Sequence, residues 1–306
     1  LDIEETLNSS NNNISSSIDS IEKPQIRIHN KNYHNFQQSE ISAIQENLLA
    51  WYRENKRDLP WRDRTVENVP YRVLVAEFMS QQTRVATVIK YFEKWIAKWP
   101  TVKDLADATI EQVNEMWAGL GYYRRAQNLH NCAKKIMTDF NGIVPSKVEQ
   151  LLTLPGIGPY TAGSISSTAF DERAAIVDGN VSRVVSRLRA IGTDPAKSSK
   201  LVWKLAEQLV PQQSPGDFNQ GLMELGAVLC SIKSPSCINC PVREQCLAFR
   251  EVSHPDLQSS LHVNDDDVCA LCETTDEHVP EVVYFPRKKI ENKTTKRDNC
   301  LCDCRE

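Results

Sequence analysis

The sequence predicts an all-α fold, and two observations lead to this prediction. Apolar residues recur at three- and four-residue steps in several segments between residues 39 and 229, as they do on the buried face of a helix. The alternating pattern of a strand is not evident before residue 280. The chain has 306 residues, of which 41% are hydrophobic, so it can bury one or two cores. It has no apolar run long enough to cross a bilayer, and we expect no membrane partner.

The charges are distributed unevenly along the chain. The net charge is -4, yet residues 51–250 contain 26 Lys and Arg against 20 Asp and Glu, or +6, which leaves -10 for the two ends. A basic middle is suited to a partner with a phosphate backbone, so we expect DNA as the partner.

Residues 1–38 are rich in Asn, Ser, Gln and Lys and poor in large apolar side chains. Burial of such a segment cannot offset the entropy lost on ordering it, so we predict a disordered N-terminal segment. Its acidic residues Asp2, Glu4 and Glu5 are atypical of a mitochondrial transit peptide. On its own, His34 is expected to be a solvated histidine of this linker.

The first helix is predicted to begin at Ser39, and the 58–61 stretch Asp-Leu-Pro-Trp ends it. Further helices are predicted between Tyr71 and Lys98, and Glu77 lies within them among apolar neighbours. A glutamate there is either a surface residue in an unfavourable place or a carboxylate held in a pocket. In a pocket, desolvation would raise its pKa toward neutrality, which suits a general acid.

Residues 117–126 read Trp-Ala-Gly-Leu-Gly-Tyr-Tyr-Arg-Arg-Ala. As plain structure this is a junction between helices with a packed tyrosine. As a DNA contact it is a wedge: the glycines let the backbone approach the duplex, an aromatic ring such as Tyr122 enters between base steps, and the arginines meet phosphates.

A tight hairpin between two helices is predicted at Leu154-Pro155-Gly156-Ile157-Gly158. Without side chains at the two glycines, a DNA strand can approach the N–H groups that open the second helix, where the helix dipole favours a phosphate. Taken alone, the same residues are equally an ordinary turn. Asp178 follows twenty residues after the second glycine, and a carboxylate at a helix start is usually an N-cap. Helical periodicity then continues at 182–191, 198–209 and 217–229.

Three segments, 77–83, 119–123 and 154–181, resemble in sequence and order those of MutY-type adenine DNA glycosylases, a branch of the helix-hairpin-helix DNA glycosylase superfamily. The resemblance implies two helical domains with the active cleft between them, beneath the hairpin. The implied divisions are a six-helix barrel domain at 66–172, an iron–sulfur cluster domain at 39–65 and 173–250, and an interdomain connector at 251–285.

The resemblance also implies the roles of single residues. Asp178 is the catalytic carboxylate that stabilises the sugar cation, and Glu77 is the general acid that protonates N7 of a flipped adenine and later acts as the base. Tyr160 and Asn180 assist orientation or proton movement. The implied DNA contacts are Gln81, Gln82, Tyr122, Arg124, Gly156, Gly158 and Lys233.

Four cysteines, Cys230, Cys237, Cys240 and Cys246, have the spacing C-x6-C-x2-C-x5-C. Disulfides are expected in a secreted protein, whereas this composition is typical of an intracellular one. Four thiolates could also bind zinc tetrahedrally. The spacing resembles the loop that holds a 4Fe-4S cluster in the endonuclease III and MutY branch, and so implies that cofactor. Lys233, between the first two cysteines, is placed to meet a phosphate.

Cys269 and Cys272 form a C-x2-C pair, which is half of a zinc site. Animal MutY homologues resemble this region: their connector carries a Cys seven residues before such a pair, and their N-terminal segment carries a His. Here His262 occupies the first of these positions and His34 the second. The resemblance therefore implies zinc as a second cofactor, with His in place of one Cys.

Three functions remain open. In the glycosylase-lyase branch of endonuclease III, a Lys that can form a Schiff base follows the hairpin glycine by two residues. Here that residue is Tyr160, which favours a monofunctional, hydrolytic adenine glycosylase. The third reading is a non-catalytic isoform that binds DNA or a clamp. The resemblance further implies a monomer, a sliding clamp bound through the connector, and localisation to the nucleus and also the mitochondrion.

Residues 282–288, Val-Val-Tyr-Phe-Pro-Arg-Lys, resemble the start of the Nudix-like domain that recognises 8-oxoguanine in the family. Residues 286–306 are expected to be a tail left from a truncated copy, because so few residues cannot build a sheet with its own core. We therefore expect excision to persist while discrimination between adenine opposite 8-oxoguanine and adenine opposite guanine is reduced.

Overall fold

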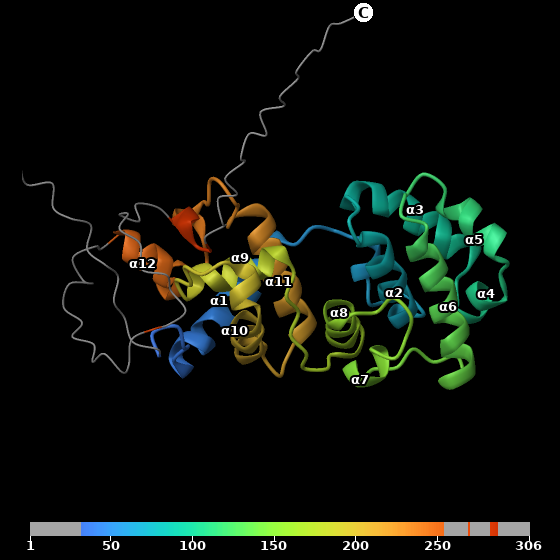
Figure 1. Ribbon diagram of the computed structural model, residues 1–306, viewed down its shortest axis with the longest axis horizontal. Coiled ribbons are helices and arrows are strands. Elements are labelled where there is room, and N and C mark those ends of the chain that lie inside the picture. Colours follow the sequence, from blue (N-terminus) through green and yellow to red (C-terminus); the bar gives the residue numbers. More distant parts are fainter. Residues whose placement is uncertain (1–31, 254–268, 270–281, 287–306) are drawn as a thin grey trace, which may run out of the picture.

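The computed structural model describes residues 32–253, 269 and 282–286. Within these ranges the fold is helical and contains no strand, which confirms the predicted all-α class. The helices form two lobes that lie end to end along the longest axis (Figure 1). Within the described part of the chain, no helix has both the length and the apolar character needed to cross a bilayer.

Helices α1 to α12 lie within residues 38–253, and η6 lies at residues 282–284. In chain order they are α1 (Gln38–Asn55), η1 (Pro60–Arg62), α2 (Val69–Ser80), α3 (Val85–Lys98), α4 (Val102–Asp107), α5 (Ile110–Trp117), α6 (Arg124–Asp139), α7 (Val148–Leu151), α8 (Pro159–Phe170), α9 (Gly179–Leu188), α10 (Pro195–Leu209), α11 (Pro215–Val228), η2 (Cys237–Asn239), η3 (Arg243–Gln245), α12 (Leu247–Ser253) and η6 (Val282–Tyr284).

The later helices begin about three residues earlier than predicted, because their start signals precede the periodic apolar residues. Asp178 caps α9 by accepting a hydrogen bond from the N–H of Val181, and Asp194 caps α10 in the same way. Proline opens α10 and α11, where its missing N–H has no intrahelical partner to lose.

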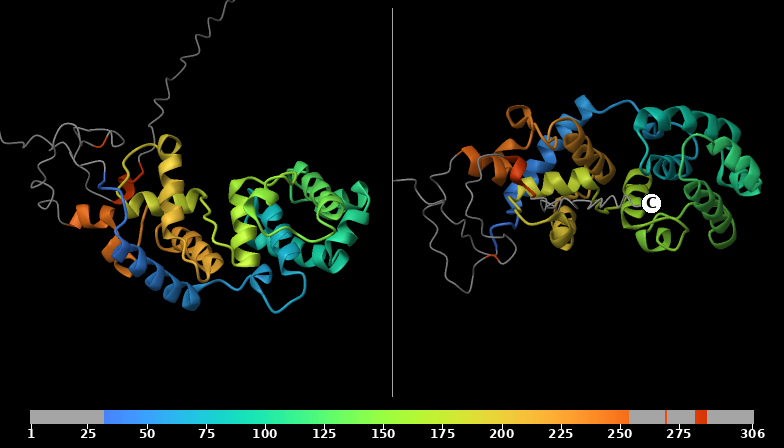
Figure 2. Two further views of the ribbon diagram at one scale, coloured as in Figure 1. Left: turned by 90° about the horizontal axis from the view of Figure 1, so that it is seen from below. Right: turned by 45° about the horizontal axis from the view of Figure 1, so that its top comes forward.

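The first lobe contains η1 and helices α2–α8, which lie together in both views of Figure 2. Its core is rich in tryptophan. Trp95 is fully buried and meets Trp99 and Trp117 edge to face, with ring centroids 4.8 and 5.5 Å apart. Trp61 of η1 meets Phe92 of α3 in the same manner at 5.3 Å. These contacts tie α3, α5 and η1 together, each adding about 0.5–1.5 kcal/mol beyond the burial of area.

The second lobe contains α1 and α9–α12 and has its own apolar core. Ile44 and Leu48 of α1 pack with Val184 of α9 and Phe218 of α11, and all four are buried. The first helix of the described chain thus packs on helices that follow it by more than a hundred residues. The domain limits implied by the family resemblance stay a prediction.

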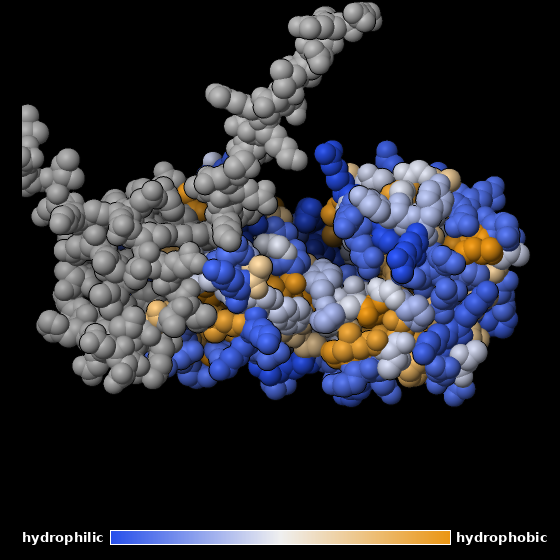
Figure 3. All heavy atoms as spheres, viewed as in Figure 1, coloured by the Kyte–Doolittle hydropathy of each residue, from blue (hydrophilic) through white to orange (hydrophobic). Residues whose placement is uncertain are grey.

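The two lobes are joined through α8 and α11. Asn219 of α11 donates to the hydroxyl of Ser167 at 2.9 Å and to the carbonyl of Ala174 at 2.8 Å. At Gly216, a Cβ atom would lie 2.6 Å from the carbonyl oxygen of Ser167, so the two helices approach as closely as their backbones allow. Figure 3 shows a notch between the lobes at the upper edge of this face.

The expectation of disorder for residues 1–38 does not hold for the last of them. Residues 32–35 form a turn, and Phe36 is buried in the second lobe. The aromatic side chain of Phe36 supplies burial that the polar composition of the segment does not. Residues 1–31 lie outside the described part of the chain.

Candidate active site

Glu77 and Ser164 meet where α2 crosses α8. The hydroxyl of Ser164 donates to Oε1 of Glu77 at 2.7 Å. Burial raises the pKa of Glu77 to about 7, the hydrogen bond from Ser164 opposes that rise, and the negative charge of Asp178 adds to it. Glu77 is therefore a partly buried carboxyl held by a neighbouring helix, and the reading as an exposed surface residue does not hold.

Asp178 is the N-cap of α9, and its carboxylate is held at both oxygens. Oδ1 accepts from the backbone N–H of Val181 at 2.7 Å, and Oδ2 accepts from the side-chain amide of Asn180 at 3.1 Å. The N-cap reading is therefore correct, and it does not exclude a chemical role. The cap fixes the carboxylate at the positive end of the helix, from where its charge still raises the pKa of Glu77.

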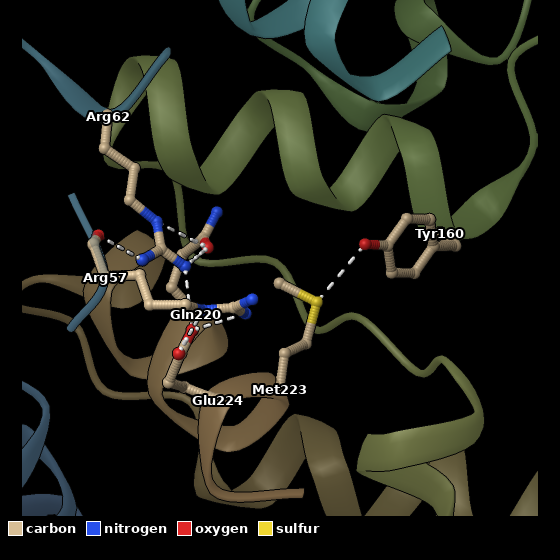
Figure 4. Close-up of polar contacts among 6 residues, drawn as sticks. All are labelled: Arg57, Arg62, Tyr160, Gln220, Met223 and Glu224. Carbon is tan, nitrogen blue, oxygen red and sulfur yellow. Dashed lines mark hydrogen bonds and ion pairs between the residues drawn. The ribbon is translucent and has the colours of Figure 1, made fainter. Parts of the chain in front are cut away.

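Tyr160 is the second residue of α8, one turn before Ser164, and it faces α11. Its hydroxyl lies 3.2 Å from the sulfur of Met223, to which it donates (Figure 4). Burial, followed by the charges of Glu77 and Asp178, raises the pKa of Tyr160 well above its usual value. The phenol is thus a neutral hydrogen-bond donor, and it shares one site with both carboxylates.

Several polar side chains of this region were not found by sequence reasoning. Arg62 of η1 donates to Oε1 of Gln220 at 2.7 Å, and Arg57 pairs with the buried carboxylate of Glu224 at 2.5 Å (Figure 4). Gln220, Met223 and Glu224 occupy positions i, i+3 and i+4 of α11 and therefore share one face. Gln220 and Glu224 are four residues apart on a helix that buries most of its residues, and this spacing was a signal in the sequence.

Asn180 links the carboxylates to the cysteine-rich loop. Its Oδ1 accepts from Nη2 of Arg183 at 2.9 Å, and the same nitrogen donates to the carbonyl of Gly226 at 2.7 Å. Nε of Arg183 donates to the carbonyl of Cys230 at 2.8 Å. A Cβ at Gly226 would lie 2.7 Å from that of Asn180, so α11 and α9 are also packed closely here.

The predicted wedge at residues 117–126 and the segment with the predicted DNA contacts Gln81 and Gln82 both present side chains to solvent. Gln82 and Tyr122 both have positive φ, 56° and 50°, which is unfavourable for residues with a Cβ, and both are exposed. Arg124 is exposed as expected of a phosphate contact, and Gln81 is partly buried. Arg125 is buried, so the prediction that both neighbouring arginines meet phosphates is wrong for this one.

The two hairpin glycines, Gly156 and Gly158, differ in backbone conformation and in the space around them. Gly156 has φ +78°, and a Cβ there would lie 2.8 Å from side-chain carbons of Phe78 and Asn128. Gly158 has an ordinary φ of -103°, and a Cβ there would meet nothing within 4 Å. The packing of the protein itself therefore requires Gly156, while only the approach of a ligand would require the absence of a side chain at Gly158.

The four cysteines predicted as cluster ligands line one pocket of the second lobe. None of them forms a disulfide. Burial raises the pKa of Cys240 to about 11 and that of Cys246 to about 12. At neutral pH these thiols would therefore ionise only when a bound cation stabilises the thiolates. The buried guanidinium of Arg187 donates to the sulfur of Cys230 at 3.2 Å. The donor set thus fits a metal centre, and Lys233 is exposed on the same loop.

Among the described residues, no three His, Cys, Asp or Glu side chains are grouped closely enough to hold a single metal ion. Two of the four predicted zinc ligands are described, and they lie together: Nε2 of His34 is 3.4 Å from the sulfur of Cys269. His34 is buried, with Nδ1 at 2.6 Å from the carbonyl of Arg189, so the expectation of a solvated histidine is wrong. His262 and Cys272 lie outside the described residues.

Comparisons with known proteins extend over most of this architecture. Residues 75–212 match the model of the HhH-GPD superfamily base excision DNA repair protein. The chain is 46% identical to a rat adenine DNA glycosylase, over 84% of this chain and 53% of that protein. It is similar in structure to endonuclease III in a non-covalent complex with DNA, with 25% identity and a TM-score of 0.59 over 72% of this chain and 99% of the other.

The chain spans about half the length of the mammalian relatives that it matches. A bacterial relative is covered more fully: the adenine DNA glycosylase of Mycobacterium tuberculosis is 42% identical over 68% of each chain. The matching regions contain the hairpin and the helices that carry both carboxylates. The chain therefore belongs to the adenine DNA glycosylase family of the HhH-GPD superfamily.

Proposed function

We propose that this chain removes adenine mispaired with 8-oxoguanine or guanine from duplex DNA by hydrolysis of the N-glycosidic bond. One observation carries the proposal: where the lobes meet, burial raises the pKa of Glu77 to about 7, and the carboxylate of Asp178 is close enough for its charge to add to that rise. Hydrolysis of a glycosidic bond needs an acid that is protonated near neutral pH and a carboxylate that stabilises the sugar cation. Family membership supports adenine as the base that leaves.

In the proposed mechanism, adenine is rotated out of the duplex into the site between α2, α8 and α11. Protonated Glu77 donates its proton to N7, which makes adenine a better leaving group, and the N-glycosidic bond breaks. Asp178 stabilises the oxocarbenium ion that remains. Water adds at the anomeric carbon, and Glu77, now ionised, accepts the proton of that water. Tyr160 donates a hydrogen bond as a neutral phenol, and Asn180 keeps Asp178 oriented.

Contacts with the duplex are assigned to the exposed residues around this site. Tyr122 and Gln82, with Gln81 beside them, would fill the gap that the flipped base leaves. Backbone N–H groups at Gly158 and the charges of two basic side chains would hold phosphates. These contacts fix the position of the protein on the duplex without reading its sequence. The basic residues in question are Arg124 and Lys233.

The two alternative functions are disfavoured by specific residues. A lyase needs an amine nucleophile, and position 160, where the family's lyase branch carries lysine, has a phenol whose pKa is raised well above its usual value. A non-catalytic DNA-binding isoform would not need both Glu77 and Asp178 to converge on one site. Hydrolysis without strand cleavage is therefore the reaction that we propose.

We also propose that the four-cysteine loop holds a 4Fe-4S cluster and that His34 and Cys269 contribute to a zinc site. A cluster separates its ligands by its own size, which fits thiols that share a pocket without gathering around one ion. When bound, the cluster would brace the loop that carries Lys233 and that Arg183 joins to Asn180. Elemental analysis of protein purified without oxygen should give about four irons and about one zinc per chain.

The reaction is tested by single-turnover excision on duplexes with adenine opposite 8-oxoguanine and opposite guanine, each analysed with and without alkali. We expect abasic sites that break only in alkali. Asp178→Asn and Glu77→Gln should abolish excision and keep duplex binding, because they remove charge and proton donation while the phosphate contacts remain. Strand breaks without alkali would support the lyase reading, and no excision by the unaltered chain would support the non-catalytic one.

A further inference from the structure

Two loops carry the residues that the proposed function inserts into the duplex, and both loops have an unfavourable backbone at the inserted residue. Gln82 follows the end of α2 with φ 56°, and Tyr122 precedes α6 with φ 50°. Both side chains are exposed, Tyr122 to 65%. A left-handed conformation at residues with a Cβ persists only where the surroundings hold it. The contacts that hold these two residues must therefore come from beneath them.

The guanidinium of Arg125 provides those contacts at the end of α2. Its Nη1 carries two hydrogens, which are shared among several acceptors: the carbonyl of Met79 at 2.9 Å, that of Phe78 at 3.3 Å and, by a short contact, that of Gln81. The same nitrogen donates to the hydroxyl of Thr83 at 3.0 Å. The last turn of a helix leaves carbonyls without intrahelical partners and carries the negative end of the dipole, so a buried cation is stabilised there.

The other nitrogen of Arg125 holds the second loop. Its Nη2 donates to the carbonyls of Leu120 at 3.2 Å and Gly121 at 3.1 Å. Trp117 donates from its indole to the same Gly121 carbonyl at 3.0 Å. The guanidinium carbon lies 5.3 Å from the ring centroid of Trp117 and 5.5 Å from that of Tyr122, as in cation–π contacts.

We propose that Arg125 is a positioning residue that holds Gln82 and Tyr122 in one fixed arrangement for insertion into the duplex. The carbonyls of Gln81 and Gly121 belong to the peptide groups that immediately precede the two left-handed residues. Fixing the plane of a peptide group restrains φ of the residue that follows it. One buried fork therefore fixes the backbone of both inserted residues relative to each other. This inference rests on the proposed function, because that function assigns the two side chains to insertion.

The shape of the guanidinium matters to this role as much as its charge. Its two terminal nitrogens bind acceptors on different loops at the same time, whereas the ammonium of a lysine is a single point. Arg125→Lys keeps the charge and should fail to hold both loops. Arg125→Met keeps the apolar stem and loses both the charge and the fork. A purely electrostatic role would be rescued by lysine, and a positioning role would not.

The first test uses the protein alone and does not depend on the proposed function. Amide hydrogen exchange is measured by mass spectrometry for the segments 79–83 and 119–123. The matched control is Arg72→Met, because Arg72 is another arginine of the first lobe that donates to a carbonyl, that of Pro60, and lies over an aromatic ring, that of Phe92. We expect Arg125→Lys and Arg125→Met to speed exchange at least about ten-fold in both segments, and Arg72→Met in neither. Unchanged exchange in either segment would overturn the inference.

The second test measures insertion. The probe is a duplex with a cleavage-resistant 2′-fluoro adenosine opposite 8-oxoguanine and with 2-aminopurine as the neighbouring base, whose fluorescence rises when the stack opens. Both Arg125 variants should lose most of this rise and excise natural adenine about 10- to 100-fold more slowly at saturating enzyme. Binding to undamaged duplex should change less than about three-fold, because phosphate contacts supply it.

A combined variant tests whether Arg125 acts through the side chains of Gln82 and Tyr122. Once Gln82→Ala and Tyr122→Ala have removed the inserted groups, adding Arg125→Met should slow excision by less than about two-fold. If Arg125→Met slows excision in this double variant as much as it does in the unaltered chain, Arg125 acts through other groups, and the inference is overturned. If the unaltered chain excises no adenine, the proposed function fails, while the exchange experiment still decides the role of Arg125.

Discussion

Glu77 is the residue whose protonation the fold alters in the way most useful for the proposed reaction. Burial raises its pKa from the ordinary 4.5 to about 7, so about half of the molecules carry this proton at pH 7, whereas almost none would at the ordinary pKa. Because the proposed step requires that proton, the single-turnover excision rate should fall as pH rises through about 7, approaching ten-fold per pH unit above it. Duplex binding measured over the same pH range is the control. A rate that is flat to pH 8.5 would contradict the role of Glu77 as the acid.

Ser164 tunes this carboxyl, because its hydroxyl donates to Oε1 of Glu77 and so lowers the pKa of that group. Ser164→Ala removes the donor and should shift the fall in excision rate to higher pH. Ser166→Ala is the matched control: Ser166 is buried on the same helix and donates to the carbonyl of Ser146 instead. Equal pH profiles for the two variants would show that Ser164 does not tune Glu77.

The same pKa shift predicts how stability depends on pH. A carboxyl whose folded pKa is raised from 4.5 to about 7 contributes stability that is present below pH 4.5 and is lost as pH rises through about 7. Glu77→Gln avoids the ionised form. We expect this variant to match the parent at pH 4.5 and to exceed it by on the order of 2 kcal/mol at pH 8. Urea unfolding at the two pH values measures the difference, and an equal difference at both would refute the assignment of the shift.

At the scale of elements, the two glycines of the hairpin between α7 and α8 differ in their surroundings: a side chain would clash with the protein at Gly156 and would not at Gly158. Gly156→Ala places a Cβ 2.8 Å from Phe78 and Asn128 in a left-handed turn, so the free energy of unfolding should fall by more than about 1 kcal/mol. Gly158→Ala meets nothing within the protein and should leave stability within about 0.5 kcal/mol. If a phosphate approaches here, Gly158→Ala should nevertheless weaken duplex binding several-fold. Unchanged binding would show that no phosphate comes close to Gly158.

At the scale of the whole molecule, the stretch between α1 and α2 crosses from one lobe to the other and is fastened to α11. Arg57 and Arg62 both pair with Glu224, whose side chain is 1% exposed. Glu224→Gln leaves two arginines without their carboxylate, and the free energy of unfolding should fall by about 3 kcal/mol. Lys103→Ala, which breaks an exposed ion pair with Asp107, should cost less than about 0.5 kcal/mol. If urea unfolding gives similar losses of free energy for Glu224→Gln and Lys103→Ala, the buried ion pairs of Glu224 stabilise the protein no more than an exposed pair does.

Much of the fold was predictable because the signals that specify a helix lie close together in the sequence. Apolar residues at helical spacing, proline at the first turn and acidic N-caps lie within a few residues of the elements that they specify. The errors were also local in origin: composition suggested disorder through residue 38, yet Phe36 is buried against the second lobe. Composition averages over a segment and cannot register one aromatic side chain that finds a partner far away in the chain.

The sequence by itself determined the helical class, the order of the motifs and the residue types available for chemistry, because these depend on short-range spacing. The tertiary structure decided which side chains share a pocket. Ser164 reaches Glu77 across 87 positions of the chain, and Tyr160 reaches Met223 across 63. It also decided that Arg124 faces solvent while Arg125 lies beneath two loops. Burial, and with it the pKa of Glu77, is set by packing between segments that are remote in sequence, and local pattern contains no record of that packing.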